Sequence, residues 1–136
     1  NPAIFALRAD ETLQVLFDRT HLNQILWNLC RNALRHCRGQ SGSVQISAQR
    51  IRGGHTVKLD VIDDGPGVPP AVRGGLFEPF VTAAQGGTGL GLYIARELCV
   101  ANGATLDYVE SSAGAQFTLT CRMGQGSTSS GTDGTR

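Results

Sequence analysis

The sequence contains two asparagines and an arginine at helical spacing, Asn28, Asn32 and Arg35. Side chains separated by four and three residues lie on one stripe of a helix, so these three could face a single ligand. The amide oxygen of Asn32 suits Mg²⁺, which takes few protein ligands and keeps waters and phosphate oxygens. Arg35 could then offset phosphate charge. The alternative is a solvated helix face whose amides cap or crosslink neighbouring loops.

A second candidate is the string Asp-Asp-Gly-Pro-Gly at residues 63–67, directly after an apolar strand end. A carboxylate at Asp63 could accept a hydrogen bond from the exocyclic amine of adenine. Gly65 and Gly67 lack a Cβ and tolerate positive φ, so the backbone could lie close to a flat base. An ordinary Asp-Gly turn is the alternative interpretation.

The most distinctive string is Gly-Gly-Thr-Gly-Leu-Gly-Leu at residues 86–92, which precedes a periodic apolar segment. Free N–H groups at a helix N-terminus bind phosphate, and the helix dipole favours its negative charge. The string is not a Walker A motif, because the sequence contains no Gly-Lys pair. It is not a Rossmann fingerprint either, because Gly87, Gly89 and Gly91 give the spacing GxGxG. A flexible linker remains the alternative.

The apolar pattern predicts the elements that must position these residues. Leu22, Ile25, Leu29 and Ala33 recur at spacings of three and four, which predicts a helix over residues 20–38. Alternation and turn signals predict the remaining elements: strands 13–17, 44–48, 57–61, 105–109 and 116–121, a helix over 89–102, and loops over 65–70 and 81–87. The expected fold is an α+β two-layer sandwich, with a mixed, mostly antiparallel sheet covered on one face by helices.

Composition limits the domain count and the possible partners. With 136 residues, 40% of them hydrophobic, the chain has the size of one domain, which we assign to residues 1–124. Residues 125–136 lack large apolar side chains and are predicted to be a disordered tail. The formal net charge of +1 and the dispersed basic residues argue against nucleic acid as a partner.

Cysteine usage and hydropathy limit the compartment. The four cysteines show neither CxxC spacing nor the density of a secreted disulfide scaffold, so we expect free thiols in a reducing cytoplasm. No apolar run approaches the length of about 20 residues that spans a bilayer. This fragment is therefore not expected to cross a membrane by itself.

The order of the motifs resembles the catalytic domain of the histidine kinases. In that family an asparagine box, an aspartate-glycine box, a phenylalanine box and a second glycine box follow one another across a Bergerat-type, or GHKL, ATP-binding fold. The matching strings are Asn-Leu-Cys-Arg-Asn-Ala at 28–33, Asp-Asp-Gly-Pro-Gly at 63–67, Leu-Phe-Glu-Pro-Phe at 76–80 and Gly-Thr-Gly-Leu-Gly-Leu at 87–92. The resemblance covers about residues 10–123.

The resemblance implies roles for individual residues. Asn32 would ligate Mg²⁺, Asp63 would bind adenine, and Asn28, Asn32 and Arg35 would form the catalytic set. The residues placed at the nucleotide are Asn32, Arg35, His36, Asp63, Gly65, Gly67, Phe80, Thr88, Gly89, Leu90 and Gly91.

The resemblance also implies an ATP lid at residues 81–86. Phe77 and Phe80 would anchor this lid, although both could equally be core residues. The short lid and the following helix look most like the nitrogen- and pilus-regulatory branch of sensor kinases. Relatives of that branch commonly carry a lysine in the lid, whereas this lid reads Val-Thr-Ala-Ala-Gln over residues 81–85, so its contact with the terminal phosphate is open.

The implied function is donation of the ATP γ-phosphoryl group to a histidine. His21, His36 and His55 are followed by Leu, Cys and Thr, so none resembles the His-Glu motif of an acceptor. The acceptor would therefore lie on a dimerisation domain outside this chain, and a response regulator would receive the phosphoryl group next. The expected location is the cytoplasm, including the cytoplasmic end of a membrane-bound sensor.

Two other classes remain open. GHKL ATPases and anti-sigma serine kinases share the fold but usually place a glutamate at position 28, where the amide of Asn28 cannot act as a base. His36 ends an Asn-Ala-x-x-His string that anti-sigma kinases also show, so Asn28 does not exclude them. The lid without lysine keeps open a degenerate nucleotide-binding regulatory module.

Overall fold

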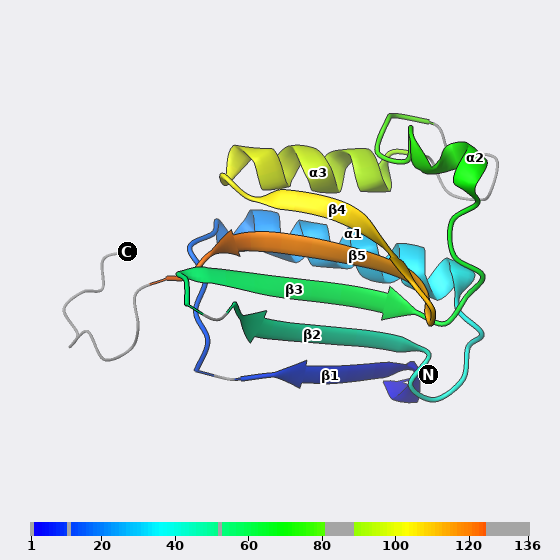
Figure 1. Cartoon of the computed structure of the whole chain (residues 1–136), viewed down its shortest axis with the longest axis horizontal. Coiled ribbons are helices and arrows are strands. Elements are labelled where there is room, and N and C mark those ends of the chain that lie inside the picture. Colours follow the sequence, from blue (N-terminus) through cyan, green and yellow to red (C-terminus); the bar gives the residue numbers. More distant parts are fainter. Residues whose placement is uncertain (1, 11, 52, 81–88, 125–136) are drawn as a thin grey trace.

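The computed structural model describes residues 2–10, 12–51, 53–80 and 89–124. They form one five-stranded sheet, with the strand order β1-β2-β3-β5-β4, and its helices cover one face (Figure 1). The elements are β1 (Phe5–Ala9), α1 (Arg19–His36), β2 (Val44–Arg50), β3 (Thr56–Asp63), α2 (Pro70–Arg73), α3 (Gly91–Ala101), β4 (Thr105–Ser111) and β5 (Gly114–Arg122), after a 3-10 turn at Pro2–Ile4.

The sheet is mixed, as the sequence predicts. Strand β1 pairs with β2 in parallel, whereas the pairs β2-β3, β3-β5 and β4-β5 are antiparallel. Helices α1 and α3 pack on each other and against the sheet. The core between the two layers is apolar and includes Ile25, Leu29, Ala95, Leu106 and Leu119, each at most 1% exposed.

Helix α1 carries the asparagines and begins one residue before the predicted start. Asp18 caps it, because its carboxylate accepts the His21 N–H at 3.0 Å. The buried side chains Ile25, Leu29 and Ala33 confirm the predicted apolar face. The helix ends at His36, two residues before the predicted end, where Cys37 takes an extended conformation.

The strand predicted over residues 13–17 is wrong. That segment contributes only an isolated bridge between Val15 and Met123, with a nearby hydrogen bond from the Leu16 N–H to the Arg122 carbonyl at 2.9 Å. The first strand is instead β1, which the sequence pattern did not reveal. All five of its residues, Phe-Ala-Leu-Arg-Ala, are exposed at the sheet edge, and periodicity alone does not assign such a short, mostly apolar run to a strand.

The other elements agree closely with the prediction. Helix α3 lies within the predicted 89–102, the predicted hairpin corresponds to β2 and β3, and β4 and β5 are each somewhat longer than predicted. The short helix α2 follows the predicted loop. The proposed tail over residues 125–136, the whole of the proposed lid over residues 81–86 and Thr88 lie outside the described residues. Within the described ranges, no helix is long and apolar enough to cross a membrane.

Candidate nucleotide-binding site

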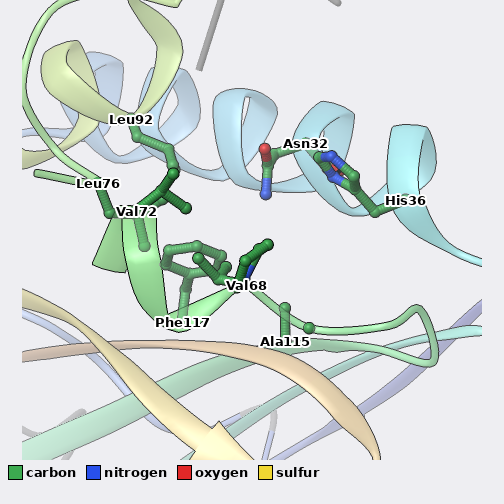
Figure 2. Close-up of a pocket in the computed structure, with 10 residues that line it drawn as sticks. Asn32, His36, Val68, Val72, Leu76, Leu92, Ala115 and Phe117 are labelled. Atoms are coloured by element: carbon green, nitrogen blue, oxygen red, sulfur yellow. Dashed lines mark hydrogen bonds between the residues drawn. The ribbon is translucent and has the colours of Figure 1, made fainter. Parts of the chain in front are cut away.

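A small pocket lies where α1, the segment that follows β3, and β5 meet (Figure 2). The ends of α1 and β3 and the short helix α2 gather at the same side of the molecule (Figure 1). The lining residues are Asn32, His36, Gly67, Val68, Pro69, Val72, Leu76, Leu92, Ala115 and Phe117. The space between them measures about 40 Å³, enough for a few water molecules. A purine therefore requires the lining side chains to move apart.

Asn32 and His36 are the polar residues that α1 contributes to the described lining of the pocket. The Asn32 side chain points from the helix toward Val68 and Phe117 (Figure 2). The Asn32 amide forms no hydrogen bond with any other described side chain or backbone group. His36 lies one turn later, and its Nδ1 is 3.0 Å from the Asn32 carbonyl oxygen. The Asn32 side chain is thus free to bind a ligand.

Asp63 is the last residue of β3 and is only 2% exposed. Its Oδ1 accepts the N–H groups of Gly65 at 2.8 Å and Ala115 at 3.4 Å. Its Oδ2 accepts no hydrogen bond from the described part of the chain. A buried carboxylate oxygen without a donor is unfavourable, so a donor such as an exocyclic amine fits here. Asp63 is not on the pocket wall itself; it borders the pocket through Ala115, which forms part of the floor.

Gly65 and Gly67, the two glycines after Asp63, are favoured at their positions for different structural reasons. A Cβ at Gly65 would overlap the carbonyl oxygen of His36, so this residue allows the β3 end to approach the α1 end. Gly67 has φ +81°, which favours glycine, and it lines the pocket. The sequence analysis predicted a close approach of both glycines to a flat base, and this stays a prediction; the close backbone contact that the structure shows is the one between Gly65 and His36.

Asp64, between Asp63 and Gly65, connects the end of β3 to the chain that follows α1. Its carboxylate accepts the Arg38 N–H and the Ser43 hydroxyl, each at 2.8 Å. The Arg38 backbone hydrogen bond, assisted by the Ser43 hydroxyl, lowers the pKa of Asp64 below its ordinary value, against a smaller opposing effect of desolvation. The sequence names Asp64 only as part of the motif, yet this side chain connects the chain after α1 to the end of β3.

Asn28 uses both polar atoms of its side chain within the protein. Its Nδ2 donates to the Gly91 carbonyl oxygen at 3.1 Å, and its Oδ1 accepts from Gln24 Nε2 at 3.2 Å. These contacts connect α1 to the first residue of α3. Arg35, the third member of the predicted catalytic set, is exposed and is not among the residues that line the pocket.

The glycine string enters α3 at Gly91. Gly89 has φ +77°, and its carbonyl accepts the Phe80 N–H at 2.7 Å. Phe80 is 65% exposed and has φ +70°. Phe77 instead packs edge-on against Phe117 at 6.0 Å between ring centroids, as a partly buried residue beside the core. The two phenylalanines therefore occupy different environments.

Most of the apolar lining was not identified from the sequence. Val68, Val72 and Leu76 follow the aspartate-glycine string, and Phe117 comes from β5. Phe117 shows the same alternation as any core residue of a strand, so no local signal distinguishes it. The position of Val68 directly after the aspartate-glycine string was the one available hint.

Comparison with known proteins identifies the family. The model of the family described as "Histidine kinase-, DNA gyrase B-, and HSP90-like ATPase" matches residues 17–125. The sensor protein kinase PilS of Pseudomonas aeruginosa is 48% identical over 101 residues, which are 71% of this chain and 18% of PilS. The sensory histidine kinase/phosphatase NtrB of Escherichia coli O157:H7 is 31% identical over 114 residues, which are 78% of this chain and 33% of NtrB.

A solved structure agrees with these relatives. Full-length ShkA in complex with AMPPNP matches with a TM-score of 0.74 and 33% identity, over 89% of this chain and 26% of ShkA. The resemblance inferred from the motifs, including the nitrogen- and pilus-regulatory branch, is confirmed. The chain belongs to the histidine kinase-, DNA gyrase B- and HSP90-like ATPase family, and it is an ATP-binding catalytic domain of the sensor histidine kinase type.

Proposed function

We propose that this domain binds magnesium-ATP in the pocket and donates the γ-phosphoryl group to a histidine on a dimerisation domain of the same protein. The observation that carries the proposal is an unpartnered polar group on the wall of a mostly apolar pocket, with a second one directly behind Ala115 of the pocket floor. These groups are the Asn32 amide and the buried Oδ2 of Asp63. The chain spans 18% of PilS and 33% of NtrB, so the activity of the whole kinase is part of the proposal.

Asp63 is the proposed adenine-binding residue. An exocyclic amine would give its Oδ2 the donor that the described residues do not supply, while the Oδ1 bonds to Gly65 and Ala115 hold the carboxylate in place. Val68, Val72 and Phe117 would contact the two faces of the base. The solved ShkA complex contains AMPPNP, an ATP analogue, which supports a nucleotide as the ligand of this related domain.

Asn32 is the proposed Mg²⁺ ligand. Among the described residues that line the pocket, Asn32 alone has an unpartnered amide, and neutral oxygens suit a hard cation that already carries phosphate oxygens. Bound Mg²⁺ would neutralise phosphate charge. His36, one turn along α1, and the exposed Arg35 are proposed to face the phosphates. The backbone around Thr88, Gly89, Leu90 and Gly91 would hold them at the start of α3.

Asn28 favours transfer over hydrolysis. An amide cannot accept a proton from water, and here both of its polar atoms already bond to Gln24 and Gly91. Phosphoryl transfer needs positioning and charge neutralisation, so a domain without its own nucleophile can act as the donor. We accordingly propose that Asn28 positions the start of α3. A response regulator would take the phosphoryl group from the histidine, and the domain would work in the cytoplasm.

The test supplies radiolabelled ATP and Mg²⁺ to this chain, together with the separate histidine-bearing dimerisation domain. We expect acid-labile label on that domain and little release of free phosphate by the chain alone. Asn32→Ala should abolish the label. Brisk hydrolysis without transfer would favour the GHKL ATPase class. No binding of an ATP analogue at millimolar concentration would favour a degenerate regulatory module.

A further inference from the structure

The outer wall of the pocket is held by two side chains that no motif includes. Val68, Pro69 and Val72 form this wall, and the segment has little regular structure apart from the four-residue helix α2. Short irregular segments depend on specific contacts for their position. The contacts of Val68 therefore decide where the wall lies.

Both backbone groups of Val68 bond to side chains. Its N–H donates to the Tyr108 hydroxyl oxygen at 3.3 Å, and its carbonyl oxygen accepts from Arg73 Nε at 2.9 Å. Tyr108 belongs to β4 and Arg73 to α2. The wall is thus connected to the sheet on one side and to its own short helix on the other.

The two side chains also contact each other. The Arg73 guanidinium lies over the Tyr108 ring at 5.6 Å from its centroid, and its Nη2 is 3.6 Å from Glu110 Oε2. The Tyr108 ring packs against Phe117 with 5.5 Å between centroids. Phe117 is part of the pocket floor. One chain of contacts therefore joins the wall, through Tyr108, to the floor.

This arrangement bears on binding, because the pocket of about 40 Å³ is too small for a purine. The side chains of Val68 and Val72 must move when a base enters, while the backbone of the wall needs to stay close enough to contact it. Holding that backbone in advance reduces the ordering cost of binding.

We propose that Arg73 and Tyr108 are positioning residues that set nucleotide affinity by holding the Val68 wall against the base. This inference rests on the proposed function, since it presumes a nucleotide in the pocket. Neither side chain lines the pocket, so both act through Val68. Loss of either contact loosens the wall and accelerates nucleotide dissociation, while the rate of transfer from the bound nucleotide stays unchanged.

The test compares Tyr108→Phe and Arg73→Lys with wild type in magnesium-ATP binding to this 136-residue chain. Tyr108→Phe removes the hydroxyl but keeps the ring on Phe117. Arg73→Lys keeps the charge beside Glu110 but removes the planar guanidinium. Each variant should raise the dissociation constant about fivefold, the effect of one hydrogen bond. The double variant should raise it by less than the product of the two effects, because both contacts hold one residue.

Asp107→Asn is the matched control. It removes an ion pair of the same 3.6 Å length, to Arg96, from the same strand and leaves Val68 untouched. Its affinity should equal that of wild type. A second control is the urea unfolding midpoint of each variant. It should show that all of them are folded in the absence of urea at the assay temperature.

Two readouts separate positioning from general destabilisation. Hydrogen exchange at the Val68 amide should accelerate in Tyr108→Phe, while core amides keep their protection. In the full-length kinase, KM for ATP should rise in both variants with kcat unchanged. Wild-type affinity in both variants, or an equal loss in Asp107→Asn, would overturn the inference and leave the proposed function intact. Absence of binding by wild type would overturn the proposed function as well.

Discussion

The Asn28 side chain donates from Nδ2 to the carbonyl oxygen of Gly91 at 3.1 Å, which connects the middle of α1 to the first residue of α3. Gly91 closes the glycine string, and Asn28 precedes Asn32 by one turn on the same helix. The hydrogen bond thus fixes the distance between the proposed Mg²⁺ ligand and the proposed phosphate-binding backbone. Asn28 therefore connects α1 to α3 in addition to being part of the asparagine box.

Asn28→Asp should destabilise the domain. A carboxylate cannot donate to the Gly91 carbonyl and would repel it, so we expect a loss of about 1–3 kcal/mol in the free energy of unfolding. Urea denaturation at pH 7 measures this loss. Asn23→Asp, an exposed change on the same helix, is the matched control and should have a small effect. Equal stability of the two variants would show that the Asn28–Gly91 bond contributes nothing.

Gly65→Ala should be far more harmful than Gly74→Ala. The added methyl group at Gly65 meets the His36 carbonyl oxygen, and overpacking against backbone costs about 1–3 kcal/mol. At Gly74 a Cβ meets nothing within 4 Å and the backbone is right-handed helical, with φ −63°. Alanine there should stabilise by about 0.4–1 kcal/mol through the unfolded state. Thermal unfolding of both variants tests the pair, and a stable Gly65→Ala domain would contradict the close approach.

The Asp64 carboxyl should make stability depend on pH. Its pKa is lowered in the folded state, chiefly by the Arg38 N–H, so its contribution is present above the unfolded pKa of about 4. That contribution is lost as the pH falls through the folded pKa. Asp64→Asn should therefore be less stable than wild type at pH 7, and the difference should shrink toward pH 3. Urea midpoints at both pH values measure it; a difference that does not change with pH would refute this role.

The thiols of Cys99 and Cys121 should be unreactive in the native domain. Burial, together with a smaller effect of the nearby Cys121, raises the pKa of Cys99 to about 12, and burial raises the pKa of Cys121 to about 11. Both thiols are therefore protonated at pH 8, and the thiolate is the reactive form. A colorimetric thiol reagent should give the same native count for wild type, Cys99→Ser and Cys121→Ser, and one thiol fewer for each variant in urea. A lower native count in either variant would contradict this.

The sequence predicts local features well because they depend on periodicity. The apolar spacing of α1 and the alternation of β2 and β3 reflect burial on one face, which the structure confirms for Ile25, Leu29 and Val61. Strand β1 was missed because Phe-Ala-Leu-Arg-Ala is a short, mostly apolar run without a clear period, and its apolar side chains lie exposed at the sheet edge.

Only those residues of the candidate site that belong to sequence motifs could be predicted from the sequence. Asn32 and Asp63 were named from strings that lie far apart in the sequence; the structure places Asn32 on the pocket wall and Asp63 behind Ala115 of its floor. The hydrogen bonds of Val68 to Tyr108 and Arg73 were not predictable, because they join a side chain on β4 and one on α2 to a loop backbone. Such contacts follow from the tertiary arrangement and leave no spacing in the sequence. The predicted roles of the site residues, Asn32 and Asp63 as well as Arg35 and Thr88, remain predictions.

The most direct test of a magnesium-ATP site built on Asp63 is calorimetric titration of an ATP analogue, with Mg²⁺, into wild type, Asp63→Asn and Asp107→Asn. Circular dichroism should first confirm that all three are folded. We predict binding by wild type and Asp107→Asn, and at least about tenfold weaker binding by Asp63→Asn, because an amide replaces a charged acceptor. Equal affinity of Asp63→Asn and wild type would contradict the account.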